Sequence, residues 1–270
     1  MELFGPNVIV DGTTVSGPTK RPNSDADRAA YERGVMAVRD KIRQTQFGTQ
    51  LLEIISNNPE PIIIAQSPSL QQAGASATKR DGSAFPAGFP ITDSTGTVVG
   101  TGTGTGSMSV ILFNPKGTFG GMGADVTLLH ELLHSYRHTR GRWSPLPIMQ
   151  FLDPAKVTNP LAERLHFENW EEWFSVVAEG IYSAEAGATS VRTTHSPLFQ
   201  LNFAQKSSVG ASNFFHPNAQ TDSEIFADKY RLAVLRIAQQ ESDIYHAMRV
   251  SKAWFNPVRD WERLLFSTRH

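Results

Sequence analysis

The chain has 270 residues, and its 25 lysines and arginines nearly balance its 26 aspartates and glutamates, which leaves a formal net charge of −1. From this balance we expect no strong electrostatic attraction to nucleic acid or to an anionic membrane. The absence of cysteine excludes a disulfide framework and a cysteine-ligated zinc, so any zinc must be bound by histidine and carboxylate side chains.

The N-terminus predicts no export signal of the Sec type, because no basic region there is followed by a long apolar run. No stretch elsewhere approaches the roughly 20 apolar residues that cross a bilayer. Residues 1–24 are predicted to form an N-terminal arm with a short strand at 8–10. A helix then begins near Asp25, a good N-cap residue, and is interrupted at Gly48; a second helical segment ends before Pro59.

Two short apolar runs, at 61–65 and 109–113, predict buried strands. Between them, from Ser67 to about Ser107, the chain is rich in glycine, serine and threonine, and we predict a flexible loop. The alternation of glycine and threonine over 100–106 resembles a phosphate-binding loop only superficially, because no Lys-Ser/Thr pair ends it and no helix follows it.

The next helix carries the motif His130-Glu131-Leu132-Leu133-His134, with Asp125 as its expected N-cap and Gly141 as its stop signal. Residues four apart lie on one face of a helix, so both histidines can offer a nitrogen to one metal ion. Zn²⁺ binds such nitrogens, keeps a position open for water, and lowers the pKa of that water until a nearby carboxylate can deprotonate it. Glu131 is the candidate base. His138, one turn further on, drifts off the ligand face and is expected at the surface.

A long helix is predicted over 163–186, followed by helices over 224–240, 243–254 and around 261–265. The chain therefore runs from helices to strands and back to helices, with no internal repeat. We predict a single α+β domain with a helical C-terminal layer.

The third metal ligand should come from outside the motif. A histidine close downstream, as in metzincins, is excluded because Arg137 stands where that motif has glycine and Arg140 where it has histidine. The alternative is one of two adjacent glutamates on the long helix, Glu171 and Glu172. Adjacent helical side chains point about 100° apart, so only one can bind the metal while the other can orient a ligand histidine.

These motifs resemble those of the NleD-type effector zinc metalloproteases, which bacteria inject into host cells. The resemblance covers about residues 30–195 and rests on the HELLH motif with Gly141, Glu171-Glu172-x-x-Ser175-Val176-x-x-Glu179, Glu185-x-Gly187, Arg192, and Asn114-Pro115 before a glycine-rich loop. The clostridial neurotoxin light chains are similar at a greater distance. The resemblance implies a zincin-like domain with a small mixed sheet, in which Glu172 is the third zinc ligand and Glu171 supports a ligand histidine.

The same resemblance implies a late Arg-x-x-Tyr pair that stabilises the oxyanion. Arg192 stands at that place, and His195 takes the position of the tyrosine; a protonated imidazole can also donate to an oxyanion. Family members usually carry Glu-Asn where this chain has Glu179-Gly180, which leaves the role of Glu179 open.

We therefore predict a zinc endopeptidase of the gluzincin type that acts on a protein or peptide, with a core at 25–220 and a C-terminal helical layer at 221–270 of the same domain. Strand 109–113 is expected to bind substrate by strand addition. The family implies an effector or toxin that is secreted without a Sec signal and injected into the host cytosol. Two alternatives stay open: a binding or toxin module in which zinc only holds the fold, and a zinc hydrolase that acts on something other than protein. The oligomeric state is left undetermined.

Overall fold

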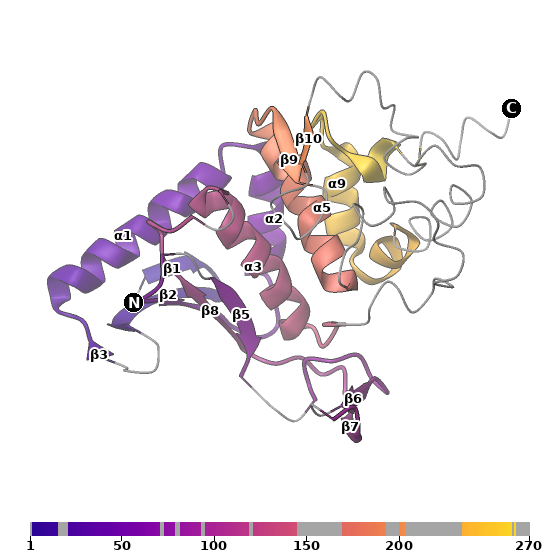
Figure 1. Ribbon diagram of the computed structural model, residues 1–270, viewed down its shortest axis with the longest axis horizontal. Helices are drawn as coiled ribbons and strands as arrows, with labels where there is room; N and C mark the ends of the chain where they lie inside the picture. Colours follow the sequence, from indigo (N-terminus) through magenta and orange to yellow (C-terminus); the bar gives the residue numbers. More distant parts are fainter. Residues whose placement is uncertain are drawn as a thin grey trace, which may run out of the picture. The chain divides into compact units, whose positions relative to one another are not determined.

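The computed structural model describes residues 2–15, 21–70, 73–78, 82–92, 95–118, 121–144, 169–192, 200–202, 234–260 and 262. They form an α+β fold, which confirms the predicted class (Figure 1). The chain divides into two compact units, the first made of Met1–Gln44 and Leu52–Ser144 and the second of Thr45–Leu51 and Pro145–His270. None of the helices in the described part of the chain has the length and apolarity that crossing a membrane requires.

The first unit is built on a mixed six-stranded sheet in the order β1-β2-β4-β8-β5, with β3 paired to β2. Its strands are β1 (Glu2–Gly5), β2 (Val8–Val15), β3 (Arg21–Pro22), β4 (Ile62–Gln66), β5 (Gly74–Ala77) and β8 (Ser109–Phe113). β2, β4 and β8 run parallel, and the other three strands pair antiparallel. The side chains of Ile62, Ile64 and Ile111 lie on the same face of the sheet and are fully buried. Both predicted strands are confirmed, the first of them one residue later than expected.

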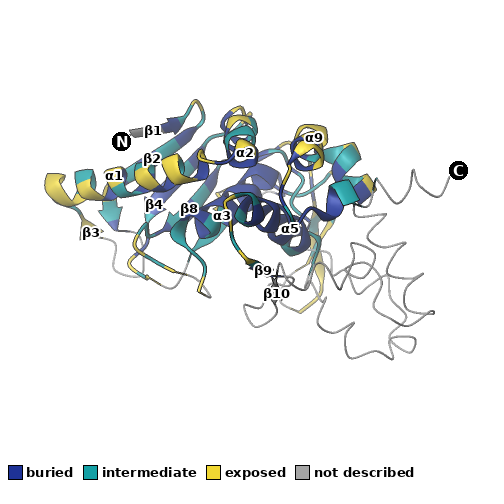
Figure 2. Cartoon of the chain, turned by 90° about the horizontal axis from the view of Figure 1, so that it is seen from above, coloured by how far each residue is buried: buried dark blue, intermediate teal, exposed yellow. Residues whose placement is uncertain are grey.

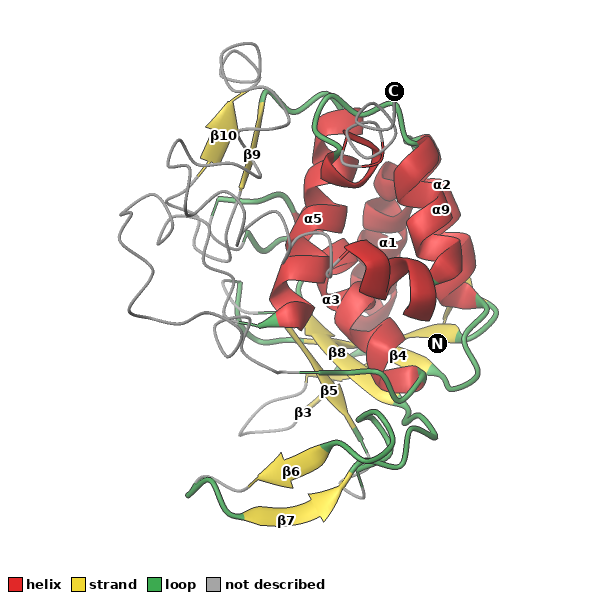
Figure 3. Cartoon of the chain, turned by 90° about the vertical axis from the view of Figure 1, so that its right-hand side faces the viewer, coloured by secondary structure: helices red, strands yellow, loops and turns green. Residues whose placement is uncertain are grey.

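Helices α1 (Asp25–Ile42) and α3 (Ala124–Thr139) cover one face of this sheet (Figures 1 and 3). α1 packs on β2, α3 packs on β5 and β8, and the two helices contact each other. The N-cap of α1 is Ser24 rather than Asp25, because the Ser24 side chain accepts a hydrogen bond from the Asp27 amide. Asp25 is the first helical residue, where its negative charge faces the positive end of the helix dipole.

Helix α2 (Gln46–Ser56) begins earlier than predicted, and Gly48 lies inside it. The break after α1 falls at residues 43–45. The hydroxyl of Thr45, a buried residue, accepts a hydrogen bond of 2.9 Å from the Gly48 amide and so satisfies a first-turn N–H group that has no partner within the helix. The predicted interruption at Gly48 was therefore wrong, because a threonine cap three residues earlier starts the helix.

The stretch from 67 to 107 is only partly a loop, which corrects the prediction. It contributes β5 to the sheet and forms a separate antiparallel hairpin of β6 (Pro90–Thr92) and β7 (Val98–Thr101). The end of the glycine-threonine alternation is held by backbone hydrogen bonds, from Gly104 to the Phe85 carbonyl at 2.9 Å and from Gly106 to the Ser83 carbonyl at 2.8 Å. Both glycines have positive φ angles, +71° and +86°, which a side chain would disfavour.

The described part of the second unit contains α5 (Trp170–Glu185), a helical segment at 234–240 and α9 (Ser242–Val250), with a short hairpin of β9 (Ser190–Arg192) and β10 (Gln200–Asn202). α5 packs against β9. The helix predicted over 163–186 begins only at Trp170, because Asn169 has an extended backbone and caps it. The remainder of this prediction at 163–168, and the helical predictions at 224–233 and 263–265, lie outside the described residues.

Candidate metal centre

Helix α3, which carries the HELLH motif, is buried on nearly all sides. Leu128, Leu129, Leu132 and Leu133 have no exposed surface, and nearly the whole helix takes the dark blue of buried residues in Figure 2. A helix that is buried nearly all round belongs to a protein core. The functional groups of the motif are therefore held on a rigid, well-packed element.

Both ends of α3 are fixed. Its N-cap is Gly123, and Asp125, which we had expected to be the cap, is its second residue and accepts a hydrogen bond of 2.8 Å from Lys41 Nζ of α1. At the other end Gly141 has a φ of +61°, and its amide donates to the His138 carbonyl, while the next amide donates to the Arg137 carbonyl. This is the Schellman pattern of helix ends, and the predicted stop at Gly141 is confirmed.

His130 and His134 face one another on α3. Their Nε2 atoms lie 3.0 Å apart, their ring centroids 4.6 Å apart, and their exposed fractions are 5% and 9%. Zn–N bonds of about 2.0–2.1 Å place two nitrogens of one tetrahedral zinc roughly 3.3 Å apart. The observed separation is close to that value, so the pair fits two ligands of a single ion.

The predicted carboxylates are placed as follows. Glu131 follows the first histidine on α3 and is half-buried. On α5, Glu171 and Glu172 lie in the first turn, the former 1% exposed and the latter half-buried. The Glu172 amide donates to Asn169 Oδ1 at 3.0 Å, which fixes the start of the helix at this residue pair. The pattern Asn-x-x-Glu in the sequence is a known signature of a helix start, and it could have given this boundary.

His130, His134 and Glu172 form a group of side chains that could hold a metal ion, since one ligand atom of each lies within 4.8 Å of those of the other two. The donor set of two imidazoles and one carboxylate suits Zn²⁺ and leaves one of four tetrahedral positions for water.

Arg192, on β9, is buried and makes a bidentate pair with Glu179 of α5. Its Nη2 donates to Oε2 at 2.5 Å, and its Nε donates to Oε1. The two side chains are 5% and 2% exposed. The role of Glu179, which the motif comparison left open, is thus to hold this guanidinium. His195 lies outside the described residues.

His138 is not at the surface, which corrects the prediction. It is 5% exposed, and its Nδ1 lies 3.2 Å from the hydroxyl of Ser109, which in turn lies 2.9 Å from the Ser135 hydroxyl. Burial, and then the charge of Arg137, lower the pKa of His138 to about 4, so the imidazole is neutral at pH 7. Periodicity alone missed this network because β5 and β8 cover the face of α3 on which His138 lies.

Strand β8 cannot bind substrate by strand addition as we had expected. Both of its edges are paired, one with β4 and the other with β5. Strand addition requires an edge with free backbone groups. Within the described residues, β1 and β5 are the strands at the two ends of the strand order.

No protein-family model matches the sequence, and no curated protein matches it. Solved structures similar to the chain include the catalytic domain of Clostridium botulinum neurotoxin serotype F, at 12% identity over 84% of this chain and 67% of that chain, with a TM-score of 0.30. The botulinum neurotoxin type G light chain is similar at 14% identity over 81% of this chain and 60% of that one, with a TM-score of 0.33. We draw no functional argument from similarity at this level. The NleD-type resemblance stays a prediction from the sequence motifs.

Proposed function

We propose that this chain is a zinc-dependent endopeptidase in which His130, His134 and Glu172 bind the metal. The observation that carries the proposal is the pair of buried Nε2 atoms 3.0 Å apart on α3, with Glu131 next to the first histidine. Two imidazole nitrogens on successive turns of one helix at this separation suit two ligands of a single ion. Three protein ligands with one position left for water are typical of a catalytic zinc, whereas a structural zinc has four.

Bound zinc would act as a Lewis acid and lower the pKa of a water molecule in this site. Glu131 accepts the proton of the attacking water and later donates it to the amine that leaves. Arg192, held by Glu179, donates to the oxyanion that develops on the scissile carbonyl, with His195 proposed as a second donor. Glu171 is proposed to orient a ligand histidine.

The motif resemblance further supports a role as a secreted effector or toxin that cleaves a protein of a host or target cell. This part of the proposal concerns where the enzyme acts and on what class of substrate. The effector role is separate from the chemistry of the site. A peptidase that cleaves only proteins of the cell that makes it would contradict the effector role and leave the peptidase assignment intact.

The deciding experiment is digestion of a proteome-derived peptide library and of host-cell lysate, with the new termini identified by mass spectrometry. The matched control is Glu131→Gln, which keeps the size and hydrogen-bonding capacity of the side chain but removes the base. We expect one zinc per chain in both proteins, specific cleavage by the wild type, and a loss of about 10²–10⁴-fold in the variant. Zinc binding without cleavage by the wild type would contradict the endopeptidase assignment, and an active Glu131→Gln protein would contradict the mechanism.

A further inference from the structure

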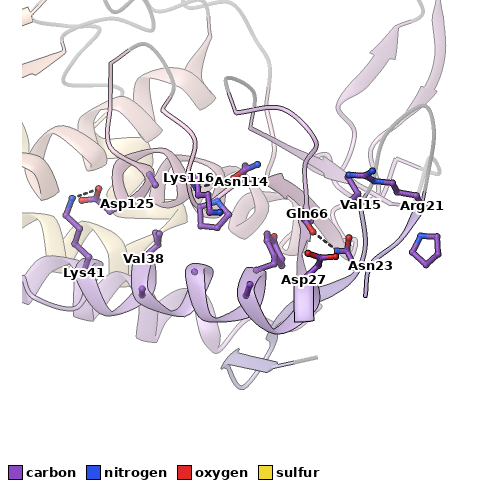
Figure 4. Close-up of a pocket in the computed structure, with 17 residues that line it drawn as sticks. Val15, Arg21, Asn23, Asp27, Val38, Lys41, Gln66, Asn114, Lys116 and Asp125 are labelled. Carbon is purple, nitrogen blue, oxygen red and sulfur yellow. Dashed lines mark hydrogen bonds and ion pairs between the residues drawn. The ribbon is translucent and has the colours of Figure 1, made fainter. Parts of the chain in front are cut away.

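A groove of about 690 Å³ lies in the first unit at the carboxyl ends of the parallel strands. Val15 ends β2, Gln66 ends β4, and Asn114 directly follows β8, and all three line it (Figure 4). In open sheets with parallel strands, ligands bind outside the carboxyl ends of the strands. The volume is within the range of small-molecule sites, about 300–1,000 Å³.

One wall of the groove is a face of α1 with small side chains. Ala30, Gly34 and Ala37 lie there at helical spacing, and a side chain at Gly34 would press against Pro115 in the loop after β8. Polar side chains also line the groove: Asn23 donates to Gln66 Oε1 at 2.6 Å and to the Gly12 carbonyl at 2.8 Å. The groove therefore combines small apolar side chains with polar groups that are fixed by hydrogen bonds, as small-molecule sites do.

A buried hydroxyl in this groove has no partner. Tyr31 lines the groove and is 5% exposed, and its hydroxyl makes no hydrogen bond within the part of the chain that the structure describes. Burying such a group unpaired is costly, and each case in a native structure calls for an explanation. Burial and the nearby carboxylates of Asp11 and Glu32 raise the pKa of Tyr31 far above its ordinary value, so the hydroxyl stays protonated and can donate.

The charged side chains that line the groove favour an anion. Lys41 is paired with Asp125 at one end, and Asp27 accepts from the Ser24 hydroxyl at 2.7 Å in the first turn of α1. Arg21, at the opposite end, and Lys116, between the two ends, are exposed and have no ion pair among the described residues (Figure 4). Among the residues that line the groove, three cations therefore stand against two carboxylates, whereas Asp11 and Glu32, which act on the Tyr31 hydroxyl, are not part of the lining.

We propose that this groove binds a small organic anion, whose carboxylate or phosphate group is bound by Arg21 and Lys116 and accepts the Tyr31 hydroxyl, and whose apolar body lies along α1. The Tyr31 hydroxyl, the Arg21 guanidinium and the Lys116 ammonium are all donors, and an acceptor-only group satisfies them together. This inference does not depend on the zinc site and goes beyond the proposed peptidase activity.

The test is an NMR titration of the full chain, labelled with ¹⁵N, with three probes that share a phenyl body. Phenyl phosphate and 4-phenylbutyrate carry the two anionic groups, and 4-phenylbutyramide is the neutral counterpart of 4-phenylbutyrate. Probe concentrations of up to about 10 mM detect complexes whose binding free energy is only a few kcal/mol. We expect backbone amide shifts at 30–41, at Asn114 and at Lys116 with at least one anion, and at least about 10-fold weaker binding of 4-phenylbutyramide. The probe that binds more tightly shows whether the natural ligand carries a phosphate or a carboxylate group.

Variants assign the binding to these residues. Arg21→Ala with Lys116→Ala should weaken the anion at least about 10-fold, whereas Arg33→Ala, an exposed cation of α1 outside the groove, should not change it. Tyr31→Phe should weaken binding about 3- to 10-fold and leave the melting temperature of the free protein unchanged or higher, because it removes an unpaired buried hydroxyl. The control Tyr245→Phe loses a hydroxyl that donates to Glu262 and should bind as the wild type does.

Three results overturn the proposal. The first is that neither anion shifts the groove amides. The second is that the neutral amide binds as tightly as the anions. The third is that Arg21→Ala with Lys116→Ala, or Tyr31→Phe, binds with wild-type affinity. A folded Tyr31→Phe protein is confirmed by its amide spectrum, so a loss of binding cannot be attributed to unfolding.

Discussion

The buried histidine at the end of α3 limits the stability of the fold at acidic pH. The pKa of His138 is about 4 in the folded chain and about 6.5 in an unfolded one. Between these values the unfolded chain binds a proton that the folded chain does not. The free energy of unfolding therefore falls as the pH falls from 6.5 toward 4. Above pH 6.5 the contribution of His138 to stability is fully present. At about 1.4 kcal/mol per pKa unit the full loss is on the order of 3 kcal/mol, of which about 2 kcal/mol is lost by pH 5.

Urea denaturation of the metal-free protein at pH 8 and pH 5 measures this loss. In His138→Asn the side-chain amide can keep a hydrogen bond to Ser109 but does not titrate. We expect the wild type to lose about 2 kcal/mol more than this variant between the two pH values. His246→Asn, which removes an exposed histidine of α9, should keep the wild-type loss. Equal losses in the wild type and in His138→Asn would refute the assignment of the pH dependence to this residue.

Three further predictions follow from the site and its supports. Glu172→Ala should lose most of its zinc by metal analysis while Glu171→Ala keeps it; the reverse result would exchange the two roles. Glu179→Gln leaves the buried Arg192 guanidinium without its counter-charge, so we expect urea denaturation to show a free energy of unfolding lower by about 3–5 kcal/mol. We also expect a lower kcat on a cleaved peptide, with KM little changed. Unchanged stability would contradict the buried pair. Gly141→Ala should cost at least about 2 kcal/mol, because the residue has a positive φ and a side chain there would collide with the Gly104 backbone; wild-type stability by urea denaturation would contradict this.

Local signals in the sequence predicted a large part of the first unit. The apolar runs gave both central parallel strands, and the histidine spacing with a downstream glycine gave α3 and its end, because each depends only on neighbours along the chain. The predicted starts of α2 and α5 were wrong for a local reason. Thr45 and Asn169 act as helix caps, whereas the predictions followed the apolar periodicity.

Other features depend on contacts between distant segments, which no local pattern contains. The burial of His138 follows from the packing of α3 on β5 and β8, and the pairing of both edges of β8 follows from the position of β5 beside it. The pairing of Glu179 with Arg192 joins a helix to the strand that packs on it. The sequence could suggest that each of these residues matters, but not which partner it meets.

The glycine-threonine segment and the end of α3 interlock through their backbones. A side chain at Gly106 would collide with the Thr139 carbonyl, and one at Gly141 would collide with Gly104. The amide of Ser107 donates to the His138 carbonyl at 3.0 Å in the same place. A segment with the composition of a tolerant linker is therefore among the least replaceable parts of this chain. Lengthening or shortening this segment would displace the backbone groups against which the C-terminal end of α3 packs.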